Sequence, residues 1–193
     1  MNRLLKFILI LCVCLLGSCA PAEPLQPSEY TQLLINIKDF FSMSLVLLGQ
    51  NNTFALGQVV SRLYYGHYHL ARLIFNNIKG YDGNSHTEVW KQMPADIKAY
   101  GKKLKEMRIK YDYEPMSFTQ NEVLQDLEYI ESHKNRFDAI IKELDNTVVR
   151  YSMNPFFNKK FNENIAEIKT TYTQISQRIA TLVDELKTNN TKK

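Results

Sequence analysis

The sequence predicts an all-α protein, an up-down bundle of four to five helices, and three observations support this. Only 7 Gly and 6 Pro occur among 193 residues, which leaves few turns and disfavours a β-sandwich or barrel. From Ser28 onward, apolar residues recur at helical spacing, and no segment alternates apolar and polar residues as a strand does. The composition, 45% hydrophobic and 23% charged, excludes wholesale disorder, and the length suits one domain.

The first two helices are each expected to end at a glycine. The first runs over about residues 29–48, before Gly49, and the second over about residues 53–79, before Gly80. Lys38 makes the first helix a poor membrane span. The apolar face of the second helix is predicted to comprise Leu56, Val59, Val60, Leu63, Leu70, Ile74 and Ile78.

Capping signals place the next two helices. Ser85, followed three residues later by Glu88, forms a capping box that opens a short third helix. Pro94 interrupts this helix and starts a longer one that ends at about Tyr113, because proline cannot continue a helix but fits its first turn.

Two helices with heptad spacing follow. Thr119 and Glu122 form a second capping box, and the helix it opens continues to about Val148, so we assign residues 29–150 to the bundle. Residues 156–188 form a C-terminal helix whose apolar residues are Phe161, Ile165, Ile168, Tyr172, Ile175, Ile179, Leu182 and Leu186. We expect these two helices to form an antiparallel hairpin. The alternative is that the last apolar stripe recruits a partner helix or a second copy of the chain.

Residues 1–18 have the features of a lipoprotein signal peptide. Arg3 and Lys6 precede an apolar run over residues 7–16, which is too short to span a bilayer. The next residues, Leu16-Gly17-Ser18-Cys19, resemble a bacterial lipobox. The resemblance implies that Cys19 is acylated and becomes the first residue of the mature chain, anchored to a membrane. Ala20 after the cysteine favours the periplasmic face of the outer membrane in a Gram-negative host.

Removal of the signal peptide changes the chemistry of the chain. All three cysteines lie in the first 19 residues, so no thiol would remain for a disulfide, a metal site or a nucleophile. Loss of Arg3 and Lys6 would reduce the formal net charge from +4 to +2. Residues 19–28 contain a proline at every third position from Pro21 to Pro27, which predicts an extended tether of roughly 25 Å.

Polar and aromatic residues are densest in the second helix, between Ser61 and Arg72. Arg62, Tyr65, His69 and Arg72 follow one another at steps of three, four and three, so they share one helical face. In the helix that ends near Tyr113, Arg108 and Asp112 are four residues apart and can pair.

These two segments, with Ser85-His86 opening the helix between them, resemble HEPN-domain proteins over about residues 30–148. The resemblance implies an up-down bundle of four or five helices, often dimeric. Family members act with nucleotidyltransferase partners, as toxins, or as metal-independent ribonucleases. The ribonucleases carry an Arg-x(4–6)-His motif near the final core helix, in which the arginine polarises phosphate and the histidine handles a proton. No histidine follows Arg108 within seven residues, so this chain departs from the catalytic pattern.

We therefore expect a lipid-anchored envelope protein with a non-catalytic binding or assembly module, whose contact surface comprises Arg62, Tyr65, His69, Arg72, Arg108 and Asp112. The alternative is a ribonuclease or nucleotide-binding protein that uses Arg62, His69 and Arg108. Convergence of these three residues on one open cleft would favour the enzyme. Pairing of Arg62 with Asp112 in a closed network would favour a structural role.

The remaining sequence signals concern partners and cofactors. No cofactor is expected, and no metal site, because His67 and His69 are two residues apart, a poor spacing on a helix. Nucleic acid is not expected as a partner, since a charge of +4 is weak. Lysines between residues 98 and 110 form either a solvated face or a surface for an anionic ligand.

Overall fold

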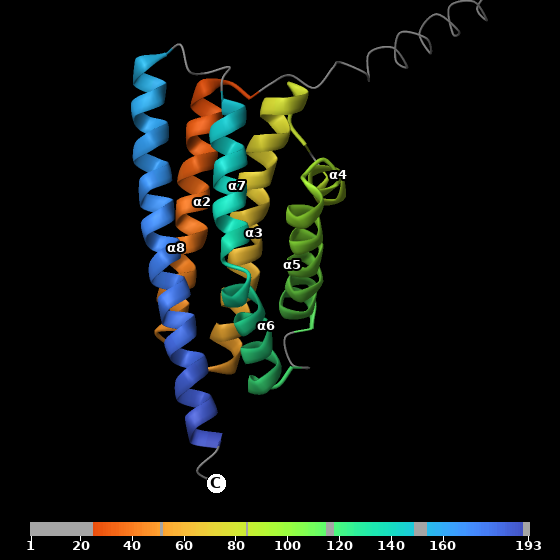
Figure 1. The fold of residues 1–193 in the computed structure, drawn as a ribbon, viewed down its shortest axis with the longest axis vertical. Helices are drawn as coiled ribbons and strands as arrows, with labels where there is room; N and C mark the ends of the chain where they lie inside the picture. The colour runs from red at the N-terminus through yellow and green to blue at the C-terminus, as the bar shows by residue number, and fades with distance from the viewer. Residues whose placement is uncertain (1–24, 51, 84, 115–117, 149–153, 191–193) are drawn as a thin grey trace, which may run out of the picture.

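The computed structural model describes residues 25–50, 52–83, 85–114, 118–148 and 154–190, and all regular structure in these ranges is helical (Figure 1). The axes of the long helices are roughly aligned along the length of the molecule, which confirms the all-α bundle. The signal peptide, Cys19, the tether up to residue 24 and residues 149–153 lie outside the described residues.

The first described helix is α2 (Pro27–Leu48), which begins inside the segment predicted to be the tether. Proline fits the first turn of a helix because that turn lacks a partner for its N–H. Gln26 and Glu29 form a capping box, in which the backbone N–H of Gln26 donates to Oε2 of Glu29 over 2.7 Å. The tether prediction over residues 19–28 was therefore two residues too long at its C-terminal end.

Helix α3 (Thr53–Lys79) matches its predicted bounds and is the central element of the bundle. The side chain of Asn52 accepts a hydrogen bond from the backbone N–H of Ala55, and Gly80 ends the helix at a φ of 77°, in the left-handed region. Helices α2, α4, α5, α6 and α7 all pack against α3. The predicted apolar face is buried except at Ile78, which is 45% exposed.

Pro94 separates α4 (His86–Lys91) from α5 (Ala95–Tyr113), as expected. The side chain of Ser85 accepts from the backbone N–H of Glu88 and so caps α4. Gly101 of α5 lies directly against Trp90 of α4: a Cβ atom at this position would lie 2.3 Å from the indole ring. The absence of a side chain at Gly101 is therefore what lets the two helices meet.

The segment predicted as a single fourth helix is two helices, α6 (Gln120–Ser132) and α7 (Asn135–Thr147). The Ser132 hydroxyl donates to the carbonyl oxygen of Tyr129 over 2.9 Å, and Nδ1 of His133 lies 2.8 Å from the same oxygen. Side chains that bond to a helix carbonyl in this way compete with the regular backbone ladder. The chain turns here, although the apolar stripe continues from Ile130 to Phe137.

The last helix, α8 (Pro155–Asn190), runs antiparallel to α6 and α7, which confirms the predicted hairpin direction (Figure 1). It packs against α6 but more extensively against α2, a neighbour that the sequence did not indicate. Its stripe from Phe161 to Leu182 is buried, so the intramolecular contacts account for it. This burial removes the main argument that the stripe recruits a partner helix.

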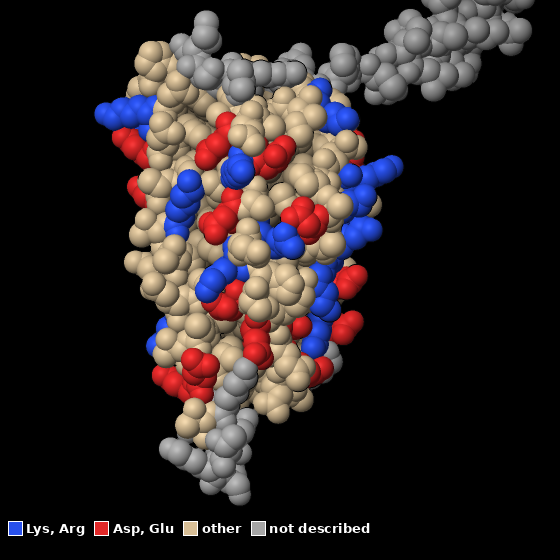
Figure 2. Space-filling view, viewed as in Figure 1, with Lys and Arg blue, Asp and Glu red and all other residues tan. Residues whose placement is uncertain are grey.

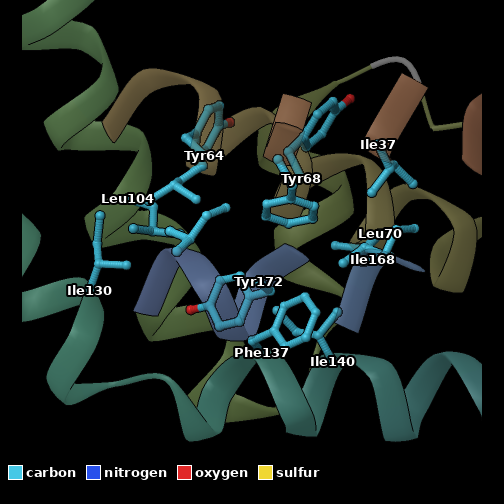
Figure 3. Packing of buried hydrophobic residues seen from close by; sticks show 14 of the residues in the cluster. Ile37, Tyr64, Tyr68, Leu70, Leu104, Ile130, Phe137, Ile140, Ile168 and Tyr172 are labelled. Carbon is cyan, nitrogen blue, oxygen red and sulfur yellow. The ribbon is translucent and has the colours of Figure 1, made fainter. Parts of the chain in front are cut away.

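Aromatic side chains are prominent in the core, and Figure 3 shows Tyr64 and Tyr68 of α3 with Phe137 of α7 and Tyr172 of α8. Phe137 of α7 and Tyr172 of α8 stack with ring centroids 3.8 Å apart and planes 10° apart. His67 of α3 lies among them, and its ring meets Phe41, Tyr100, Phe137 and Tyr172 edge-on at 5.4 to 5.8 Å. Burial lowers the pKa of this histidine to about 4, although its hydrogen bond to the Leu63 carbonyl opposes the shift.

One helix in the described part of the chain, α2, is long and apolar enough to cross a membrane by length and composition. The same properties are typical of the core helix of a soluble protein and of a signal sequence. In this structure α2 packs against α3 and α8, and it buries Tyr30, Leu34, Ile37 and Phe41 against them.

A candidate ligand pocket between α2 and α3

Over residues 54–72, the central helix α3 reaches solvent along only one narrow face. Between residues 54 and 72, every side chain is buried except six that follow at steps of four, four, three, four and three. We call this set the α3 stripe, and it consists of Phe54, Gln58, Arg62, Tyr65, His69 and Arg72. The spacing places all six on one face. The helical spacing in the sequence correctly placed the last four members of the α3 stripe on one face.

Tyr65 of the stripe joins a polar network that includes α5. Nε of Arg108 lies 2.6 Å from Oδ2 of Asp112, and the side chains are only 15% and 17% exposed. The Ser61 hydroxyl donates to Oδ1 of Asp112 over 2.5 Å, and the Tyr65 hydroxyl lies 3.3 Å from Oδ2. Arg108 donates to the Tyr65 hydroxyl and lies 5.0 Å from the centre of the Tyr65 ring. This closed network ties α3 to α5.

Arg72, at the end of the stripe, is also paired. Its Nε donates to Oδ1 of Asp82 over 2.6 Å, and its terminal nitrogen Nη2 donates to Oδ2 of the same carboxylate. The hydrogen bond to Asp82 raises the pKa of Arg72, so the guanidinium stays charged. The bidentate geometry holds the loop after α3 against the helix.

Arg62 differs from the other two arginines. It donates a hydrogen bond of 3.4 Å to Oε1 of Gln58, one turn away on the same helix. Within the described ranges, no carboxylate lies within 4 Å of Arg62, so its remaining donors have no acidic partner. Arg62 does not pair with Asp112, the arrangement that would have favoured a structural role, because Arg108 occupies that carboxylate.

Arg62 lines an open pocket of about 550 Å³ between α2 and α3. We call it the α2–α3 pocket. Its walls are Asn36, Asp39, Phe40, Met43 and Leu47 from α2 and Gln58, Arg62 and His69 from α3. Eleven residues separate Gln58 from His69, which corresponds to roughly 16 Å along the helix. The pocket is therefore elongated along the two helices, and most of the surface it exposes is apolar, although five of its eight lining residues are polar or charged.

His69 lies at one end of this pocket beneath Phe40. The two rings stack with centroids 5.5 Å apart and planes 14° apart, and Phe40 stacks in the same way on Tyr65. Nδ1 of His69 is buried without a hydrogen-bond partner in the described structure. Burial lowers the pKa of His69 to about 4, and the positive charges of Arg72 and His86 add to the shift. The imidazole is therefore neutral near pH 7.

The three residues of the enzyme hypothesis do not all meet at the pocket. Arg62 and His69 line it, whereas Arg108 is held in the network with Asp112 and Tyr65. Phe40, Met43 and the other α2 residues of the pocket were missed. They look like ordinary helix residues in the sequence, and only the packing of α2 beside the α3 stripe gives them a role. Phe54 and Gln58 were also missed, although their helical register extends the stripe.

The described residues offer no group of three His, Cys, Asp or Glu side chains that could hold a metal ion. On the face shown in Figure 2, acidic and basic side chains are interspersed, and Lys and Arg side chains gather along the edge where α5 lies in Figure 1. No protein-family model, curated protein or solved structure matches this chain, so the site rests on its geometry alone.

Proposed function

We propose that this protein is a lipid-anchored envelope protein whose helical bundle, similar to a HEPN domain, binds a small apolar ligand without catalysing a reaction. The observation that carries the binding role is the α2–α3 pocket, with its mainly apolar exposed surface and the uncompensated charge of Arg62. Concave, mainly apolar pockets with a few polar groups are typical of ligand sites. The anchor is supported by the Leu16-Gly17-Ser18-Cys19 segment.

The binding role is tested with Nile red, a neutral dye that fluoresces in apolar sites. The protein is the chain from residue 19, which is the mature form under this proposal, with Cys19→Ser to prevent acylation. We expect saturable binding of one dye per chain and its loss in Leu47→Arg, which places a charge in the pocket wall. A matched change on an exposed face, Thr181→Arg, leaves binding intact. Absence of saturable binding, or equal loss in both variants, contradicts the proposal.

The anchor is tested by mass spectrometry of the protein from its host membranes. We expect an N-terminal peptide that begins at Cys19 and carries acyl chains, and no such peptide in Cys19→Ser. A mature chain that retains Met1 contradicts this part of the proposal. An acylated peptide from a sorting-competent Gram-negative host should fractionate with the outer membrane, because Ala20 follows the cysteine.

A ribonuclease or nucleotide-binding protein is the second candidate, because Arg62 and His69 line the same pocket. A neutral histidine beside a free arginine can accept a proton while the arginine holds phosphate. Degradation of RNA by the purified chain, lost in both Arg62→Gln and His69→Ala, would favour this candidate. Loss in Arg108→Gln as well would show that the α5 network takes part.

A further inference from the structure

The polar and apolar groups of the α2–α3 pocket are not evenly distributed. Asn36, Asp39 and His69 lie at one end, while Leu47 and Gln58 lie at the other, with Arg62 and Met43 between them. An anionic ligand group is disfavoured near Asp39 and favoured beside Arg62. The pocket therefore has one place for a negative charge, beside Arg62, and that place adjoins the end of the pocket that holds Leu47.

Exposed apolar side chains lie in and around the end of the pocket that holds Leu47. Met43 is 50% exposed, Val46 is 62% exposed and both lie on the same face of α2. Phe54, 56% exposed, precedes Gln58 by one helical turn on α3. These three are among only seven large hydrophobic side chains that are exposed in the described residues. A ligand with its charge at Arg62 can thus cover apolar surface over roughly 12 Å of α3, from Arg62 to Phe54, beside the C-terminal end of α2.

The guanidinium of Arg62 suits a carboxylate. Its fork of donors matches the two oxygens of that group, and its hydrogen bond of 3.4 Å to Gln58 leaves most donors available. The other two arginines of the region are already engaged by Asp82 and Asp112. Charge complementarity therefore selects a single negative charge at this position.

We infer that the α2–α3 pocket binds a single-chain amphiphile with one carboxylate, that is, a fatty acid. The carboxylate accepts hydrogen bonds from Arg62, and the chain lies along Met43 and Leu47 towards Val46 and Phe54. An elongated pocket of about 550 Å³ has room for one flexible chain. This inference rests on the proposed binding role and specifies its ligand.

The experiment measures binding of dodecanoate, dodecanol and dodecyltrimethylammonium to the mature chain with Cys19→Ser by isothermal titration calorimetry, below the micelle concentrations of the two ionic amphiphiles and below the solubility limit of dodecanol. We expect dodecanoate to bind one per chain and at least tenfold more tightly than dodecanol, with the cationic amphiphile weakest. Acetate, which has the charge without the chain, should not bind measurably.

Two matched variants assign the charge preference. Arg62→Gln should reduce dodecanoate affinity at least tenfold, to that of dodecanol, and leave dodecanol affinity unchanged. Lys102→Gln removes an exposed cation from α5 and should change neither affinity. Circular dichroism establishes that each variant is folded.

The inference is overturned if dodecanoate binds no better than dodecanol, or if Arg62→Gln retains the preference. It is also overturned if Lys102→Gln loses the preference to the same extent, since the effect would then be general electrostatics. If Nile red still binds in these cases, the pocket is a site for other chemistry and the proposed function stands. If Nile red also fails to bind, the proposed function fails with it.

Discussion

The buried histidine His67 makes the stability of the fold sensitive to acid in a way that can be calculated. Its side chain is fully buried, its Nδ1 bonds to the Leu63 carbonyl, and its Nε2 has no partner in the described structure. The four aromatic rings around it offer no counter-charge. The folded state therefore holds the neutral form, while the unfolded chain takes up a proton near the ordinary pKa of 6.5.

The sign and size follow from proton linkage. Because the pKa falls from 6.5 to about 4 on folding, the unfolded state binds more protons between these values. The contribution of His67 is thus complete above pH 6.5 and is lost as the pH falls towards 4. A shift of this size corresponds to about 3 kcal/mol when the loss is complete, and to about 2 kcal/mol between about pH 7 and pH 4.5.

The assay is urea denaturation of the wild type and of His67→Leu at about pH 7 and pH 4.5. Leucine is similar in size to histidine, but it is apolar and cannot be protonated. We expect its free energy of unfolding to fall by about 2 kcal/mol less than that of the wild type over this interval. Equal pH dependence of the two proteins would show that His67 does not cause the loss of stability in acid, whatever the difference in stability between them at pH 7.

Three further changes test the packing and the polar network. Gly101→Ala should destabilise the fold by about 1–3 kcal/mol in thermal unfolding, because the added Cβ meets the Trp90 ring and this outweighs the better helix propensity of alanine. Asp112→Asn should cost about 2 kcal/mol because it leaves the charge of Arg108 without its half-buried partner; an increase in stability would contradict the network. Glu163→Gln, in an exposed ion pair, should cost less than about 0.5 kcal/mol and serves as its control.

Much of the fold was predictable because its signals are local. Asn52 and Gly80 define the ends of α3 through a side-chain cap and a left-handed residue, so its bounds could be read from the sequence. The division between α6 and α7 could not, because the apolar stripe continues through it and the turn depends on how Ser132 and His133 bond to one carbonyl. The dominant contact of α8 with α2 joins segments far apart in the chain, for which spacing carries no information.

The candidate site was only half visible for the same reason. Helical periodicity placed Arg62, Tyr65, His69 and Arg72 on one face, and the structure confirms this. Periodicity does not say which arginine pairs with which carboxylate. The engagement of Arg108 with Asp112 and of Arg72 with Asp82 leaves Arg62 as the arginine of the pocket. The α2 wall, including Phe40, depends on tertiary packing.

Amide chemical-shift mapping of the mature chain with Cys19→Ser, on addition of dodecanoate, is the most direct test of whether a fatty acid binds in the α2–α3 pocket. If the fatty acid binds in the α2–α3 pocket, the shifts are confined to α2 between Asn36 and Leu47 and to α3 between Phe54 and His69, on both sides of the pocket. Shifts centred on the smaller pocket between α7 and α8, around Phe137 and Tyr172, or the absence of shifts at saturating dodecanoate, would contradict it.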